Sequence, residues 1–259
     1  MPYYDQHVHT YFSFDSDAQF EAYLAQTDHP FVTTEHLEMF NPDDEHHDNK
    51  PDYRAYVQKL DALHQKYPNQ FLRGIEVGYY EPKLNDIYAY LDANRYDLVL
   101  LSFHHNGEYD FQDDHFKTVD KKALVQAYYA RMLAGVRRFD GADVLAHFEY
   151  GLRVLDVTPS ELAAWARPMI QGIFSEIIAK QMALELNTKS MYLWHDVALY
   201  DLVIPWYQAL GGKLFTLGSD AHVPEAFEME FTQAKALLHR HHIEQLAVYQ
   251  DHQPTLVTF

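Results

Sequence analysis

Four of the first 17 residues, MPYYDQHVHTYFSFDSD, are histidines and aspartates at or just behind the end of a short strand-like run. They are His7, His9, Asp15 and Asp17. On an extended strand, side chains two residues apart share a face, so the imidazoles of His7 and His9 point the same way. Two imidazoles and a nearby carboxylate can bind a metal ion, but the same residues can also be polar groups of the surface. The pattern in the rest of the chain decides between the two.

Composition narrows the class of protein. The chain has 259 residues, 47% of them hydrophobic and 22% charged, which suits one α/β barrel with a large core. The absence of cysteine excludes disulfides, thiolate zinc sites and cysteine nucleophiles, and leaves nitrogen and oxygen ligands for any metal. A net charge of −18 disfavours nucleic acid as a partner. With neither a membrane-spanning run nor a signal sequence, we expect a cytoplasmic protein that does not bind membranes.

Strand-like and helical segments alternate along the whole sequence. This alternation predicts βαβ units, a parallel sheet, and a closed or nearly closed barrel of seven units. One or two short strands are expected at the carboxyl end of the chain. Strands are expected at residues 2–9, 30–36, 71–80, 97–105, 143–151, 183–188 and 213–222, and helices near 17–27, 52–67, 83–93, 121–139, 159–181, 197–210 and 228–240.

Histidine and carboxylate side chains recur at the carboxyl ends of these strands. In a parallel barrel those ends meet at one rim, where active sites lie. Buried charges are costly unless they are paired or bound to metal, so a shared metal cluster explains the pattern better than packing does. The residues are His7, His9, Glu35, His36, Glu76, His104, His105, His147, Glu149, Glu185, Asn187, Asp220 and His222.

Seven short segments in the same order resemble the motifs of the polymerase and histidinol phosphatase (PHP) superfamily. The likeness is greatest to its monofunctional histidinol-phosphate phosphatase branch. It implies an α/β fold, a distorted (β/α)7 TIM-like barrel with a metal site at the carboxyl ends of the strands, formed by residues 1–259 as a single PHP-type domain. The segments are HVHT at 7–10, FSFDS at 12–16, TTEH at 33–36, GIEVGYY at 74–80, SFHH at 102–105, AHFEYGLR at 146–153 and GSDAH at 218–222.

The resemblance also implies two to three divalent metal ions, and the mixture of nitrogen and oxygen ligands suits Zn, Mn or Fe. Many relatives carry histidine where this chain has Asp15, although a carboxylate is also a competent ligand. The implied ligands are His7, His9, Glu76 and Asp220 for one metal, Glu76, His104 and His147 for a second, and Asp15, His36 and His222 for a third.

Structural roles remain open for several of these residues. Glu76 can instead form a buried salt bridge, and Asp15 can cap the following helix. Arg153 can form a surface ion pair, and His105 can be a solvent-facing neighbour of a ligand.

The implied reaction is hydrolysis of a phosphomonoester. Our hypothesis is in-line attack by a metal-bridging hydroxide, without a covalent phosphoenzyme. Arg153 is expected to bind the phosphate through its guanidinium fork, with Lys189 as a second cation. His105 is a candidate catalytic residue that protonates the leaving group.

The small phosphorylated substrate that best fits the resemblance is L-histidinol phosphate, which is hydrolysed to L-histidinol and phosphate. Asp17, Glu108 and Glu149 are candidates to meet its cationic groups. Alternatives are a phosphatase acting on another small phosphomonoester or on phosphotyrosine protein, and a catalytically inactive metal-binding regulatory module. The sequence leaves the oligomeric state open.

Overall fold

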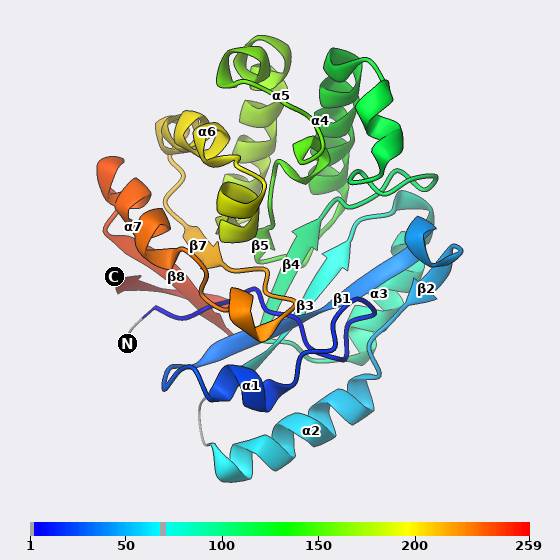
Figure 1. Ribbon diagram of the computed structural model, residues 1–259, viewed down its shortest axis with the longest axis vertical. Helices are drawn as coiled ribbons and strands as arrows, with labels where there is room; N and C mark the ends of the chain where they lie inside the picture. Colours follow the sequence, from blue (N-terminus) through cyan, green and yellow to red (C-terminus); the bar gives the residue numbers. More distant parts are fainter. Residues whose placement is uncertain (1–2, 68–70) are drawn as a thin grey trace.

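The fold is built on a seven-stranded, mostly parallel sheet. In this computed structural model, which describes residues 3–67 and 71–259, the strand order is β2-β1-β3-β4-β5-β6-β7 (Figure 1). Only the edge strand β2 runs antiparallel to its neighbour. The α/β architecture with a parallel sheet is therefore confirmed. The strands are β1 (Phe31–Asn41), β2 (His47–Asn49), β3 (Phe71–Gly78), β4 (Leu98–Ser102), β5 (Val144–Leu145), β6 (Ala183–Asn187) and β7 (Phe215–Gly218).

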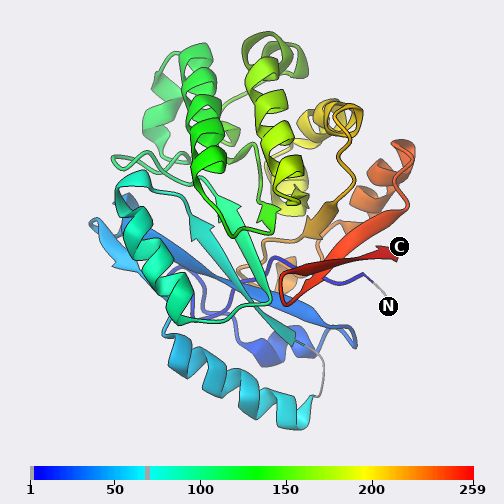
Figure 2. The ribbon, with the colours of Figure 1, turned by 180° about the vertical axis from the view of Figure 1, so that it is seen from behind.

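Helices follow most of these strands and lie outside them (Figures 1 and 2). The backbone amides of a helix's first turn lack partners within the helix, and a side chain at the N-cap can accept a hydrogen bond from them. Asp52, Asp120 and Thr158 do so at the starts of three helices. No helix in the described ranges is long and apolar enough to cross a membrane. The helices are α1 (Phe20–Leu24), α2 (Tyr53–Lys66), α3 (Leu84–Ala93), α4 (Lys121–Arg138), α5 (Pro159–Ala179), α6 (Val197–Ala209) and α7 (Phe231–Arg240).

The amino-terminal segment is not the regular strand that was predicted over residues 2–9. Pro2 lies outside the described residues, and in the remainder only Val8 forms bridges, one to Thr33 and one to Ala221. The Asp5 carboxylate accepts the amides of His7, at 3.1 Å, and Ser219, at 3.0 Å, so side-chain contacts replace part of a regular ladder.

The same segment nevertheless joins the two ends of the parallel sheet. On the β1 side, the amide of Thr34 donates to the carbonyl of Val8 at 2.7 Å. On the β7 side, the amide of Asp220 donates to the carbonyl of His7, and that of His9 to the carbonyl of Ala221, both at 2.8 Å. The sheet itself is open, and this irregular segment bridges β1 and β7.

Predicted and observed elements differ in length, as three examples show. The helix expected at 17–27 is reduced to α1, whose amino terminus has no side-chain cap. The strand expected to end at residue 36 continues to Asn41, because Leu37 and Met39 are also buried. The strand expected at 143–151 is only Val144–Leu145, since the chain turns immediately after it to present His147.

Two further segments complete the architecture. Strand β2 lies within the polar stretch NPDDEHHDNKPD, where no strand was expected. The carboxyl-terminal strands β8 (Gln245–Gln250) and β9 (Gln253–Thr258) form an antiparallel hairpin, which confirms the expected short strands. The hairpin is tied to the amino-terminal segment, because Gln6 donates to the carbonyl of Ala247 at 2.8 Å and accepts the amide of Tyr249 at 2.8 Å.

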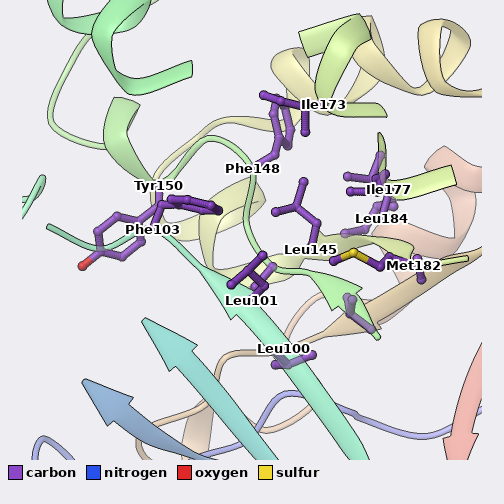
Figure 3. Close-up of a cluster of buried hydrophobic side chains, with 14 of the residues drawn as sticks. Leu100, Leu101, Phe103, Leu145, Phe148, Tyr150, Ile173, Ile177, Met182 and Leu184 are labelled. Carbon is purple, nitrogen blue, oxygen red and sulfur yellow. The ribbon is translucent and has the colours of Figure 1, made fainter. Parts of the chain in front are cut away.

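A continuous apolar core fixes the strands beneath the rim. Leu100 and Leu101 are both fully buried although neighbouring strand residues point to opposite faces, as a parallel sheet covered on both faces requires. Their packing makes a rigid base for the side chains that follow each strand. The part of this core drawn in Figure 3 includes Leu100, Leu101, Phe103, Leu145, Phe148, Tyr150, Ile173, Ile177, Met182 and Leu184.

Candidate metal centre and active site

Glu76 on β3 is the centre of the candidate site. Its side chain is buried, and its Oε2 atom faces three imidazoles. It lies 3.2 Å from His7 Nε2, 3.3 Å from His9 Nε2 and 3.2 Å from His36 Nδ1. Strand pairing accounts for part of this arrangement, because His36 on β1 is the register partner of Glu76.

The other oxygen of Glu76 faces a second set of imidazoles. Its Oε1 atom is 3.1 Å from His104 Nε2 and 2.8 Å from His147 Nε2. These histidines follow β4 and β5, the next two strands of the sheet. The two carboxylate oxygens therefore point into two different groups of nitrogen atoms, which is the geometry of a bridging ligand.

A third group lies towards solvent. Asp15 Oδ2 is 3.4 Å from His36 Nε2 and 3.1 Å from His222 Nε2. The rings of His36 and His222 also pack against His9, with centroid separations of 4.2 and 4.1 Å. Asp15 thus faces two histidines instead of capping α1.

Asp220 follows β7 and contacts two cations as well as histidines, including His222, whose Nδ1 atom is 3.3 Å from Asp220 Oδ1. Its Oδ1 atom is 4.0 Å from His7 Nε2 and 3.8 Å from His9 Nε2, but 3.2 Å from the ammonium of Lys189. Its Oδ2 atom is 3.3 Å from Arg153 Nη2. Its backbone has φ +53°, a left-handed conformation that aspartate adopts more readily than most residues.

Unsatisfied nitrogens show that these residues suit a metal. His9 Nε2 and His36 Nδ1 are buried without a hydrogen-bond partner among the described residues. Such atoms are costly unless something binds them, and divalent ions take nitrogen and oxygen ligands of this kind. Four sets of residues bring their ligand atoms within 4.8 Å of one another: His9, His36 and His222; His7, His9 and Glu76; His7, His147 and Asp220; and His36, Glu76 and His104.

Carboxylates behind the histidines set the direction of the rings. Glu185 Oε1 is 2.7 Å from His7 Nδ1, and Glu38 Oε2 is 2.6 Å from His104 Nδ1. A partner on one ring nitrogen fixes the tautomer and aims the other nitrogen inward, as is usual for metal-ligating histidines. No role was predicted for Glu38, although it lies two residues beyond His36, on the same face of β1.

The charges of the site keep two carboxylates ionised and one imidazole neutral. Burial lowers the pKa of His7 and of His104, but the neighbouring carboxylates Glu185 and Glu38 raise both well above the usual value. Burial alone would raise the pKa of Glu76, but the imidazoles of His7 and His104 hold that pKa well below its usual value. Burial also raises the pKa of Asp220, and Lys189 and other cations reverse this to a lowered value. Burial lowers the pKa of His147 to about 4. Metal ions bind to ionised carboxylates and to neutral imidazoles.

The histidine and carboxylate groups open into a small polar cavity with two cations at its edge. Arg153 is buried, and its Nε atom donates to Ser190 Oγ at 3.1 Å, so the guanidinium is held in place. Lys189 begins a short π-helix after β6. The cavity is lined by Asp15, His36, Glu38, Glu76, His104, Asp110, Gln112, His147, Tyr150, Arg153, Lys189, Asp220 and His222.

Four residues that were predicted to contact the substrate do not line this cavity. The ring of His105 is 1% exposed, and its Nε2 atom is turned to Glu38 Oε1 at 2.9 Å. Asp17 and Glu108 are exposed and do not line the cavity. Glu149 is fully buried and does not line it either.

Besides Glu38, sequence reasoning missed three residues that line the cavity. Asp110 and Gln112 lie in the loop between β4 and α4, where no periodic pattern marks a position. Tyr150 belongs to the AHFEYGLR segment, but an aromatic residue after a strand is more often part of the core.

Comparison with known proteins identifies relatives of this chain. A curated protein named "Probable histidinol-phosphatase" from Clostridium acetobutylicum is 26% identical over 240 residues, covering 89% of this chain and 91% of its own. The "Histidinol-phosphatase" of Lactococcus lactis subsp. lactis is 24% identical over 253 residues, covering 95% and 93%.

A solved structure shares the fold. The crystal structure of histidinol phosphate phosphatase from Lactococcus lactis subsp. lactis, complexed with zinc, L-histidinol and phosphate, superposes with a TM-score of 0.86 at 23% identity. The match covers 97% of this chain and 98% of that one. The PHP domain family matches residues 5–189, and the chain therefore belongs to that family.

Proposed function

We propose that this protein is a metal-dependent phosphomonoesterase that hydrolyses L-histidinol phosphate to L-histidinol and phosphate. The observation that carries the proposal is Glu76, whose two oxygens face separate groups of histidines at the edge of a cavity that also holds Arg153 and Lys189. Two of the curated relatives are named as histidinol-phosphatases, and the solved structure of similar fold was determined with L-histidinol and phosphate.

We assign two to three divalent ions to the cluster, with zinc, manganese and iron as candidates. The distances support Glu76 as the ligand shared between the first two ions. Zinc is present in the solved structure of similar fold. The proposed ligands are His7, His9, Glu76 and Asp220 for one ion, Glu76, His104 and His147 for a second, and Asp15, His36 and His222 for a third.

When bound, divalent ions supply the Lewis acidity that lowers the pKa of water and neutralises the phosphoryl oxygens. The protein supplies the remaining positive charge through Arg153 and Lys189, which lie on the two oxygens of Asp220. Ser190 holds the Arg153 guanidinium before substrate arrives, so little side-chain freedom is lost on binding phosphate. The buried carboxylates Glu38 and Glu185 keep the rings of His104 and His7 oriented throughout.

Phosphate release from the purified, metal-loaded protein tests the proposal. L-histidinol phosphate should be compared with phosphotyrosine, a nucleotide and a simple alkyl phosphate after loading with Zn, Mn or Fe. We expect kcat/KM for L-histidinol phosphate to exceed the others by about 100-fold, which corresponds to about 2.7 kcal/mol of discrimination. Equal, slow hydrolysis of all esters would leave a phosphatase of another specificity, and metal binding without phosphate release would leave a regulatory module.

We also propose that the whole chain forms one domain. The contacts of Gln6 with the β8–β9 hairpin support this, because they join the two ends of the sequence. Both ends lie on the same side of the molecule (Figures 1 and 2).

A further inference from the structure

Asp110 is a buried carboxylate in the cavity wall without a salt-bridge partner in the described part of the chain. Its residue is 9% exposed, and it forms no ion pair within residues 3–67 and 71–259. It accepts the amide of Gln112 at 2.7 Å and the hydroxyl of Tyr150 at 3.0 Å. Burial raises the pKa of Asp110 to about 6, so the carboxyl is still ionised at neutral pH. An unpaired buried anion of this kind is costly, and a cationic ligand would relieve that cost.

Tyr150 fixes where Asp110 stands relative to the metal cluster. The tyrosine ring packs against His104 and His147, with centroid separations of 4.7 and 5.1 Å. The Arg153 guanidinium lies over the same ring, 4.5 Å from its centroid. The ring thus contacts the phosphate-binding side of the cavity, while its hydroxyl contacts Asp110.

The donors and acceptors at Tyr150 orient the Asp110 carboxylate. Gln112 Nε2 is only a donor, and it donates to the Tyr150 oxygen. The single hydroxyl hydrogen of Tyr150 is therefore free to donate to Asp110. Asp110 receives two donors from the protein, and a carboxylate has lone pairs left for a third.

We propose that Asp110, oriented by Tyr150, determines specificity by binding the protonated amine of the substrate. The inference rests on the proposed function, in which the phosphate lies at the metals and Arg153. In L-histidinol phosphate the ammonium is on the carbon next to the phosphate-bearing carbon, so an anion in the same small cavity meets it at short reach. Asp17 and Glu108, the acids expected from sequence for this role, are exposed and lie outside the cavity.

A matched pair of substrates separates amine recognition from phosphate chemistry. Phosphate release is measured with 2-aminoethyl phosphate and with ethyl phosphate, which differ only in the amine, alongside L-histidinol phosphate. In Asp110→Asn we expect the ratio of kcat/KM for aminoethyl over ethyl phosphate to fall by about 10- to 100-fold, the effect of losing a charged hydrogen bond. Glu108→Gln removes one charge from the same loop outside the cavity, and we expect it to leave both rates and their ratio unchanged.

The ethyl phosphate rate reports folding and metal loading in every preparation. An unchanged ratio in an Asp110→Asn protein that still hydrolyses ethyl phosphate would overturn the inference. A loss confined to L-histidinol phosphate would also overturn it, because the imidazole and not the amine would then be the group recognised. If the wild-type protein hydrolyses no monoester at all, it is the proposed function that fails, and the inference falls with it.

A second variant covers the case in which Asp110→Asn does not fold. Tyr150→Phe keeps the ring that packs on His104 but removes the hydroxyl that orients the carboxylate. We expect the same ratio to fall by about 5-fold, the size of one neutral hydrogen bond. An unchanged ratio in this variant would contradict the orienting role of Tyr150 and, with it, the inference.

Discussion

Two parts of the histidine-carboxylate cluster differ sharply in burial. The side chain of Glu76 is 1% exposed, whereas those of Asp15 and His222 are 35% and 18% exposed. Yet both parts are built from the same residue types at similar separations. The inner group comprises His7, His9, Glu76, His104 and His147, and the outer group comprises Asp15, His36 and His222.

The contacts behind the imidazole rings also differ between the inner and the outer group. Two of the inner rings have carboxylates on their far nitrogens, Glu185 behind His7 and Glu38 behind His104. The Nδ1 atom of His222 lies 3.0 Å from the carbonyl oxygen of Asp220, 3.2 Å from the ammonium of Lys189 and 3.3 Å from the carboxylate of Asp220. Fixed donors need less ordering when a metal binds. We therefore expect the inner group to be assembled before metal arrives, and the more exposed outer group to hold an ion more weakly.

The largest effect is expected at Glu76, the residue proposed to be shared by the two inner metals. Glu76→Gln replaces a bridging carboxylate with a neutral amide, and we expect kcat/KM for L-histidinol phosphate to fall by about 1000-fold or more. Bound metal, measured by elemental analysis, should fall in parallel. Glu176→Gln, which breaks only a surface pair with Arg137, is the control and should keep both. Normal turnover in Glu76→Gln would contradict the proposal that Glu76 is the central ligand of the inner group.

The outer group is tested by removing its carboxylate. In Asp15→Ala we expect the metal content to fall by about one ion per chain and kcat/KM to fall by about 10- to 100-fold, while the inner ions stay bound. Burial raises the pKa of Asp15, but His36 and His222 lower it overall, so the carboxylate is charged at neutral pH in the wild type. Loss of all metal in this variant would show that the two groups are one site.

A smaller effect is expected from the carboxylate behind the inner ring of His104. Glu38→Gln keeps the size of the side chain but weakens the bond that fixes the tautomer, and we expect kcat/KM and metal affinity to fall about 10-fold. Competition with a chelator measures the affinity. Identical chelator curves for variant and wild type would mean that the ring of His104 needs no such support.

The pH dependence of specificity extends the comparison to the substrate side. Above pH about 6 the Asp110 carboxylate is charged, and below it the charge is lost, because burial raises its pKa to about 6. Besides burial, the groups that act on it are His104, the backbone amide of Gln112, the Asp43 carboxylate and Tyr150. We expect the aminoethyl-to-ethyl phosphate ratio to fall about 5-fold or more between pH 8 and pH 5. A ratio that is equally pH-dependent in Asp110→Asn would contradict this assignment.

The smallest effect lies outside the cluster. Thr158 caps α5 in a reciprocal bond with Glu161, so Thr158→Ala should lower the free energy of unfolding by about 1 kcal/mol. Chemical denaturation measures this change. Metal content and turnover should not move, and a change in either would mean that the cluster is coupled to the scaffold as a whole.

The inner group was predictable because simple periodicity places it. Parallel strands bring their carboxyl ends to one rim, so His7, Glu76, His104 and His147 could be expected together from spacing and strand order alone. The resemblance to the PHP family then implied which of these residues bind each metal ion. The irregular start of the barrel was not predictable, since it depends on Asp5 accepting amides as distant as that of Ser219.

The sequence pattern did not predict the loop residues that line the cavity or the contacts that orient the ligands. Asp110 and Gln112 occupy a loop whose path is set by tertiary contacts with Tyr150. Asp17 and His105 looked equally suitable in sequence, but one is exposed and the other is turned to Glu38. Which of two neighbouring polar residues enters a cavity depends on backbone direction, and composition does not encode that direction.

Titration of the metal-free protein tests the central claim most directly. Zinc is added in known equivalents while phosphate release from L-histidinol phosphate is followed. We predict no turnover without metal, a steep rise over the first two equivalents as the inner group fills, and a further, weaker rise with the third. Full turnover in the metal-free protein, or stoichiometric zinc binding with no phosphate release, would contradict the account.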